Sequence, residues 1–136
     1  MIDAQAPDTP ALLLDEARMQ RNIARLADHA RELGVRLRPH LKTAKSVDVA
    51  RQLTGGAPGP ITVSTLAEAE VFFADGYNDI LYAVGIAPQK LTRVQTLRQE
   101  GCDLVVILDN AAQAQATAEA AVPAMIEIDS DGHRGG

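Results

Sequence analysis

Arg-Leu-Arg-Pro-His-Leu-Lys-Thr-Ala-Lys, residues 36–45, is the stretch that decides how the chain is interpreted. Side chains alternate between the two faces of a β-strand, so the pattern predicts a strand over 35–41 that runs into a loop. One face of this strand is apolar, and the other carries Arg36, Arg38, His40 and Lys42. Helical patterns flank the stretch, and strands in an α/β layer are normally covered on both faces. We therefore expect this cationic face to be partly buried and to have a function.

Strand and helix patterns alternate along the rest of the chain. Further strands are expected at 11–14, 61–64, 80–84, 104–108 and 124–129, and all but the last are followed by an amphipathic or capped segment. The spacing of about 20 to 25 residues between strands is typical of βα units with parallel strands. Helix starts are indicated at Asp15, Ser46, Pro88 and Asp109, and Thr65 with Glu68 forms a capping box.

Two architectures use this order of elements. A doubly wound sheet usually has a glycine-rich turn after its first strand, and residues 39–44 contain no glycine. A β/α barrel places its chemistry at the carboxyl ends of its strands, where Lys42 and Asp129 both fall. We therefore expect an α/β fold, a partial (β/α)8 TIM-type barrel formed by residues 1–136 as a single unit.

The number of units is too small for a complete barrel. A closed barrel needs eight βα units and about 250 residues, whereas this chain offers about five units of parallel strands. We expect the barrel not to be closed, with an unpaired strand edge and an uncovered apolar interior. The chain could be part of a longer protein, flatten into a sheet, or rely on a second chain.

Composition excludes several classes of function. The net charge is -5, and the 13 basic residues form no basic run, so nucleic-acid binding is not expected. The first ten residues contain neither a signal peptide nor a membrane span, and we expect a cytoplasmic protein without a membrane partner. The single cysteine, Cys102, follows Gly101 at the start of an apolar run, which favours a buried core thiol over a nucleophile.

Lys42 is the candidate reactive group. Neighbouring positive charge and partial burial both disfavour the ammonium form of a lysine, so more of the nucleophilic free amine is expected. A free amine can form a Schiff base with an aldehyde. From the spacing alone, a solvated loop lysine at the end of a strand is the stronger interpretation, and Lys45 is a rival that lies farther out in the loop.

Four segments of the chain, in order, resemble one family. They are residues 8–15 (DTPALLLD), 38–43 (RPHLKT), 61–70 (ITVSTLAEAE) and 127–136 (EIDSDGHRGG). Together they are similar to the D-threonine aldolase and D-serine dehydratase group, which resembles alanine racemase in its amino-terminal barrel. The resemblance implies a fold type III pyridoxal-phosphate enzyme, with this chain matching the amino-terminal portion. One departure is Ala44, where many relatives have a histidine.

The resemblance assigns residues to the cofactor site. Lys42 matches the family's catalytic Schiff-base lysine, and Arg134 matches the arginine that hydrogen-bonds the phenolic oxygen of the cofactor. His40 matches a residue that could support the cofactor, although a core histidine bonded to a backbone carbonyl is an alternative. For Arg134 the alternative is a surface arginine. Glu127 and Asp129 are expected to meet the cationic face through an internal salt-bridge network.

The resemblance also implies the chemistry. The expected activity is that of a lyase acting on small D-3-hydroxy amino acids, by retro-aldol cleavage of D-threonine or by dehydration of D-serine. The family's divalent-metal ligands and phosphate-binding loops come from later sequence, so no metal ligand is assigned here. A homodimer is compatible with the family. The alternative is a truncated, inactive barrel fragment or a protein that binds pyridoxal phosphate weakly.

Overall fold

The computed structural model describes residues 8–133 and 135 of the 136-residue chain. Residues 1–37 and 38–136 form two compact units, and each is described by itself. The first unit contains α1 (Glu16–Glu32), which begins at Asp15 as predicted. The Asp15 carboxylate accepts a hydrogen bond from the Arg18 amide at 2.9 Å. The helix ends at Leu33, and Gly34 follows with a φ of 66°.

The strand expected at residues 11–14 is not formed. Residues 11–15 are not assigned to a helix or strand. Leu12, Leu13 and Leu14 are 92%, 65% and 62% exposed. An apolar run becomes a strand only where a neighbouring strand accepts and donates its backbone hydrogen bonds. Within the described part of the chain, no strand pairs with this segment.

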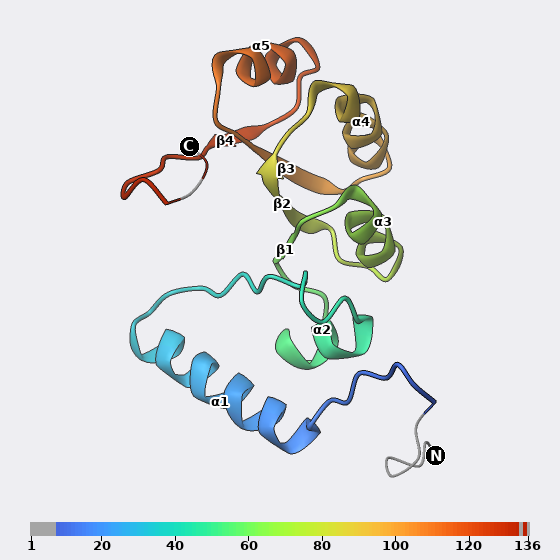
Figure 1. The fold of residues 1–136 in the computed structure, drawn as a ribbon, viewed down its shortest axis with the longest axis vertical. Helices are drawn as coiled ribbons and strands as arrows, with labels where there is room; N and C mark the ends of the chain where they lie inside the picture. The colour runs from blue at the N-terminus through green and yellow to red at the C-terminus, as the bar shows by residue number, and fades with distance from the viewer. Residues whose placement is uncertain (1–7, 134, 136) are drawn as a thin grey trace. The chain divides into compact units, whose positions relative to one another are not determined.

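The second unit is a parallel sheet whose strands alternate with helices (Figure 1). The sheet order is β1-β2-β3-β4, which is also the order along the chain, and all three pairings are parallel. The elements are α2 (Val47–Leu53), β1 (Ile61–Val63), α3 (Leu66–Ala74), β2 (Asp79–Gly85), the 3₁₀ helix η1 (Pro88–Lys90), α4 (Leu91–Gln99), β3 (Asp103–Leu108), α5 (Ala111–Glu119) and β4 (Ala124–Ile126).

This topology confirms the predicted fold class. In a doubly wound sheet the strand order reverses and helices cover both faces, whereas here the order is sequential. Helices α3, α4 and α5 lie along one side of the sheet (Figure 1). Four consecutive strands with their helices on one side form an open segment of a β/α barrel.

The predicted strand over 35–41 contracts to a single parallel bridge between His40 and Thr62. Its two hydrogen bonds run from the Thr62 amide to the Pro39 carbonyl and from the Leu41 amide to the Thr62 carbonyl, both at 2.9 Å. The next bond toward the amino end would need an amide hydrogen on Pro39, which proline lacks. At the other end, the Ser64 amide donates to the Glu68 carboxylate instead. The ladder therefore stops after one residue on each side.

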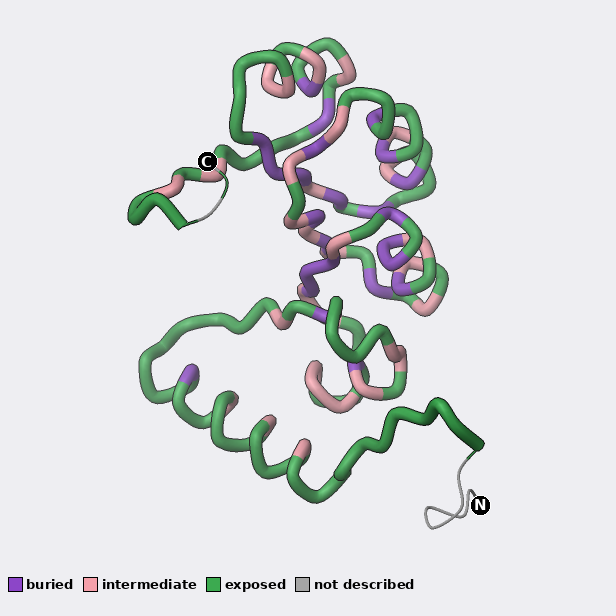
Figure 2. Tube along the Cα trace, in the orientation of Figure 1, coloured by how far each residue is buried: buried purple, intermediate pink, exposed green. Residues whose placement is uncertain are grey.

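The core lies between the sheet and its helices (Figure 2). Alternate strand residues point into it, including Ile80 and Tyr82 from β2 and Val106 from β3, all with no exposed surface. Phe72 of α3 and Tyr77 pack edge to face, with ring centroids 5.8 Å apart. Such aromatic contacts add to the free energy gained by burial.

The opposite face and the last strand are open. Met125 and Ile126 of β4 are 56% and 74% exposed, and Leu81 and Val105 are half-buried. The expected unclosed barrel with an uncovered edge is therefore observed. In the described part of the chain, no helix is long and apolar enough to cross a membrane.

Most predicted helix starts are confirmed by their side-chain caps. Ser46 caps α2 and Thr65 caps α3 through hydrogen bonds to the amides of Val49 and Glu68. The prediction for α5 was wrong by one residue, because Asn110 rather than Asp109 caps the helix. The Asn110 side chain accepts from the Gln113 amide at 2.9 Å. Either side chain can form this bond, so the sequence alone does not distinguish them.

Candidate active site at the carboxyl edge of the sheet

Lys42 lies in a tight turn just beyond the bridge between His40 and Thr62. The Lys45 amide closes this turn by donating to the Leu41 carbonyl at 2.9 Å, and Leu41 is anchored in the core with 1% exposure. The strands are parallel, so this turn lies at the same edge as the segments that follow β1, β3 and β4. That edge is where β/α barrels carry their chemistry.

The Lys42 side chain is exposed, which corrects the expected burial of the cationic face. Arg36 and His40 are exposed as well, because the segment is an open bridge rather than an interior strand. Arg38 is only partly covered, and it turns to the amino end of β2. There its Nη1 lies 2.7 Å from Asp79 Oδ1. The cationic residues therefore do not act as one buried cluster.

His40 connects the bridge to the Lys42 turn. Its Nδ1 accepts a hydrogen bond from the Lys42 amide at 3.3 Å, and its Nε2 lies 3.4 Å from the Ser64 hydroxyl. Burial and the neighbouring Lys42 charge lower the pKa of His40 below 6.5, against opposing effects of Glu68 and the Thr62 backbone. The ring is therefore neutral at neutral pH, with Nδ1 as the acceptor and the proton on Nε2.

Glu68 makes contacts that the capping-box interpretation did not predict. Its carboxylate is 9% exposed and accepts from the Ser64 amide at 2.8 Å, one residue before the predicted cap. The other oxygen lies 3.4 Å from Lys45 Nζ. Burial raises the pKa of Glu68, but the Ser64 amide and Lys45 together outweigh it, so the net shift is downward. The sequence indicates only the helix cap formed by Thr65 and Glu68; nothing in it indicates the pairing of Glu68 with Lys45.

The ends of β3 and β4 contribute carboxylates to the same edge. A Cβ placed on Gly135 would lie 3.5 Å from Asp109 Oδ2 and 3.6 Å from Glu127 Oε2. Asp129 Oδ1 accepts from the backbone amides of residues 131, 132 and 133, at 3.2, 2.8 and 3.3 Å. Arg134, predicted to bind the cofactor, lies outside the described residues. Among the residues that are described, no group of three or more His, Cys, Asp or Glu side chains is arranged to hold a metal ion.

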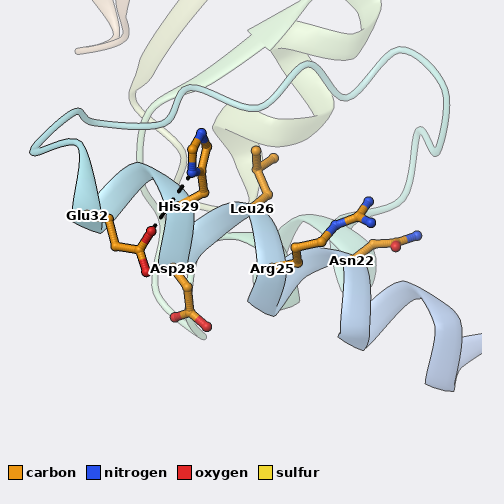
Figure 3. Close-up of a pocket in the computed structure, with 6 residues that line it drawn as sticks. All are labelled: Asn22, Arg25, Leu26, Asp28, His29 and Glu32. Carbon is orange, nitrogen blue, oxygen red and sulfur yellow. Dashed lines mark ion pairs between the residues drawn. The ribbon is translucent and has the colours of Figure 1, made fainter.

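A separate hollow runs along α1 in the first unit (Figure 3). It is lined by Asn22, Arg25, Leu26, Asp28, His29 and Glu32. Three of its charged side chains pair along the same helix, His29 Nδ1 with Glu32 Oε2 at 4.0 Å and Asp28 with Arg31 at 2.7 Å. Pairs at this spacing are typical of a solvated helix face. None of the predicted site residues contributes to this hollow, so we assign the candidate site to the Lys42 edge.

Comparison with known proteins agrees with this geometry. The family model for the alanine racemase N-terminal domain matches residues 14–136. The chain belongs to this family. The matched region includes all four parallel strands of the open sheet.

Individual relatives of this family are dehydratases and aldolases by name. The D-threo-3-hydroxyaspartate dehydratase of Delftia sp. (strain HT23) is 56% identical over 136 residues, covering 95% of this chain and 36% of the relative. Its solved structure superposes with a TM-score of 0.89, covering 96% of this chain and 36% of the relative. D-serine dehydratase of Dictyostelium discoideum is 33% identical, covering 76% of this chain and 27% of the relative.

A solved D-threonine aldolase from Filomicrobium marinum is 30% identical with a TM-score of 0.78, and the match covers 95% of this chain and 37% of that one. The chain therefore spans about a third of the length of these relatives.

Proposed function

We propose that this chain forms the amino-terminal part of a pyridoxal-phosphate-dependent lyase acting on D-3-hydroxy amino acids, with Lys42 as the residue that binds the cofactor covalently. The observation that carries the proposal is the state of the Lys42 amine. It is exposed at the carboxyl edge of the sheet, and among the described residues it forms no hydrogen bond or ion pair.

The other two lysines of the chain are engaged. Lys45 Nζ is paired with Glu68, and Lys90 Nζ donates to the Tyr82 hydroxyl at 3.0 Å and lies 5.6 Å from the centre of that ring. An amine must be free of such partners and deprotonated to attack the aldehyde carbon of the cofactor. The Lys42 amine is therefore more available to the cofactor than the amine of Lys45 or of Lys90.

Each residue of the site has a distinct role in this proposal. The cofactor, when bound, supplies an electron sink for negative charge at the substrate Cα. Lys42 holds the cofactor until the amino group of the substrate displaces it. Neutral His40 keeps the Lys42 turn in place through its Nδ1 acceptor. Arg134 is predicted to hydrogen-bond the phenolic oxygen of the cofactor through its fixed array of donors.

The type of bond cleavage is the finer part of the proposal. Loss of the hydroxyl group would be a dehydration, and cleavage between Cα and Cβ would be a retro-aldol reaction. The name of the 56% identical relative favours dehydration of D-threo-3-hydroxyaspartate. The phosphate and metal sites would come from sequence outside these 136 residues, so the chain alone should bind the cofactor weakly and depend on a longer chain or a second copy for turnover.

Reductive trapping tests the assignment of Lys42. The purified chain is mixed with pyridoxal phosphate, reduced with borohydride, and digested for mass spectrometry. Because the chain has three lysines, the label can be assigned to one of Lys42, Lys45 and Lys90. We expect it on Lys42. Lys42→Arg should abolish it, whereas the matched variants Lys45→Arg and Lys90→Arg should retain it. Equal labelling of all three lysines would refute the proposal.

An alternative function is a barrel fragment that binds pyridoxal phosphate without turnover. To separate the two, D-threo-3-hydroxyaspartate, D-serine and D-threonine are each incubated with pyridoxal phosphate, a divalent metal, and either the parent chain or Lys42→Arg. Formation of keto acid or aldehyde that depends on Lys42 supports the lyase. Labelling of Lys42 without product supports the binding protein. Sedimentation would show whether a homodimer forms.

A further inference from the structure

We propose that Glu68 is a positioning residue for Lys42, acting through a clasp formed by its carboxylate, the Ser64 amide and the Lys45 ammonium. This inference rests on the proposed function only in assigning the cofactor to Lys42. The clasp itself is defined by contacts within the chain. It joins the first turn of α3 to the turn that carries Lys42.

The turn at residues 41–45 is fixed at one end by the sheet. Leu41 donates to Thr62 and is buried, so the start of the turn cannot move without disturbing the core. The other end depends on Lys45, whose backbone φ is 47°. Residues with a side chain adopt this left-handed conformation rarely. The conformation persists only where the surroundings hold it.

The Lys45 side chain provides that hold. Its Nζ reaches Glu68 Oε1 at 3.4 Å, although the rest of the side chain is 62% exposed. The carboxylate is nearly buried, so it is screened less by water than a surface carboxylate. Its second oxygen is fixed by the Ser64 amide at 2.8 Å. Glu68 is therefore a nearly buried carboxylate to which the second end of the Lys42 turn is attached.

A second connection runs from Glu68 to the front of the turn. The Ser64 amide donates to Glu68, while the Ser64 hydroxyl lies 3.4 Å from His40 Nε2. His40 Nδ1 then accepts from the Lys42 amide. Both sides of the turn are thus linked to one carboxylate, and the Lys42 amine itself stays unengaged.

Helix capping alone does not explain this arrangement. Capping requires only that the Glu68 carboxylate accept a hydrogen bond from a backbone amide such as that of Ser64. It does not require an ion pair with Lys45. Glu70 provides a comparison on the same helix. It pairs with Arg93 of α4, and within the described part of the chain it forms no hydrogen bond or ion pair with residues 41–45. A positioning role therefore predicts effects for Glu68 that the Glu70 ion pair does not produce.

Amide hydrogen exchange tests the clasp without any cofactor. Glu68→Gln keeps an acceptor for Ser64 and removes the charge that holds Lys45. We expect exchange at the Lys42 and Lys45 amides to accelerate on the order of tenfold, the effect typical of losing one charge-assisted hydrogen bond. Glu70→Gln should leave both amides unchanged. Exchange within twofold of the parent chain in Glu68→Gln would overturn the proposal.

Lys45 variants cover the case in which Glu68→Gln does not fold. Lys45→Met removes the ion pair from its exposed partner and should produce the same acceleration at the Lys42 amide. Lys45→Arg should preserve slow exchange, because it can still reach the carboxylate. A Lys45→Met variant with unchanged exchange would refute the clasp.

Trapping with pyridoxal phosphate and borohydride then links the clasp to chemistry. In the parent chain the label should be on Lys42, and in Glu68→Gln it should be shared with the released Lys45. A parent chain that is not labelled on Lys42 contradicts the proposed function. The clasp is then tested by the hydrogen-exchange rates alone. Labelling confined to Lys42 in both proteins contradicts the clasp alone.

Discussion

Arg38→Met is expected to destabilise the second unit, because Arg38 replaces the strand pairing that Pro39 prevents. Arg38 Nη1 lies 2.7 Å from Asp79 Oδ1, and it also donates to the carbonyls of Ile61 and Asp79 at 3.3 and 3.2 Å. One side chain thus connects residue 38 to the start of β1 and the start of β2. Methionine preserves much of the apolar stem but none of these polar contacts.

The magnitude follows from the exposure and length of these contacts. The two side chains are 36% and 44% exposed, so the ion pair is worth about 0.5 to 1 kcal/mol. The two carbonyl bonds are long, and together they contribute about 1 kcal/mol more. The expected loss in the free energy of unfolding is about 1.5 to 2 kcal/mol. With a urea m-value of about 2 kcal/mol per molar, the midpoint should fall by about 1 M.

Urea denaturation followed by circular dichroism measures this loss, with Arg36→Met as the matched control. Arg36 is two residues away and exposed, and it has no hydrogen bond or ion pair with the described residues. A double-mutant cycle with Asp79→Asn should give a coupling of about 0.5 to 1 kcal/mol that shrinks at high salt. A midpoint for Arg38→Met equal to that for Arg36→Met would refute the reasoning.

Two further predictions concern titratable groups. Because the pKa of His40 is lowered below 6.5, its contribution to stability is present above pH 6.5 and is lost as pH falls through the folded-state pKa. The unfolding free energy should decrease from pH 7 to pH 5, less so in His40→Gln, and an NMR titration of His40 above 6.5 would contradict this. Burial, aided by Asp103, raises the pKa of Cys102 from 9.0 to about 11. Alkylation at pH 8 should therefore be about a hundredfold slower in the folded chain than in urea, and equal rates would be inconsistent with the buried thiol.

Helices were the part of this fold that the sequence predicted best, for a local reason. Asp15, Ser46 and Thr65 each bond to an amide three residues ahead, so the signal and its partner lie within one turn. The strand at 35–41 was predicted from alternation, which is also local, yet the ladder depends on the partner strand. Pro39 lacks the donor, and the Ser64 amide is used by Glu68. Neither the missing Pro39 donor nor the Ser64–Glu68 hydrogen bond changes the alternation of apolar and polar residues, so the pattern could not show that the strand would be short.

The site was predicted only as far as its own short segment. Residues 36–45 made Lys42 a candidate and the family resemblance added His40; their cofactor roles stay predictions, and the expected partial burial of Lys42 was wrong. Glu68 was identified as a capping residue, but its contact with Lys45 spans 23 residues and depends on how β1 lies beside the bridge. The Arg38–Asp79 pair at the start of β2 was not predicted, and the expected meeting of Glu127 and Asp129 with the cationic face stays a prediction. These partners are set by the tertiary structure.

The positions of Arg38 and Lys42 show how one short segment serves both edges of the sheet. Arg38 lies at the amino end of β1 and β2, where its contacts hold the segment to the sheet. Lys42 lies four residues later at the carboxyl edge, where its amine forms no hydrogen bond or ion pair with the described residues. In β/α barrels the amino edge contributes stability and the carboxyl edge contributes chemistry. The single bridge at His40 makes this division possible, because side chains rather than a long ladder fix the segment, and the Lys42 side chain is exposed while its backbone amide is held by His40.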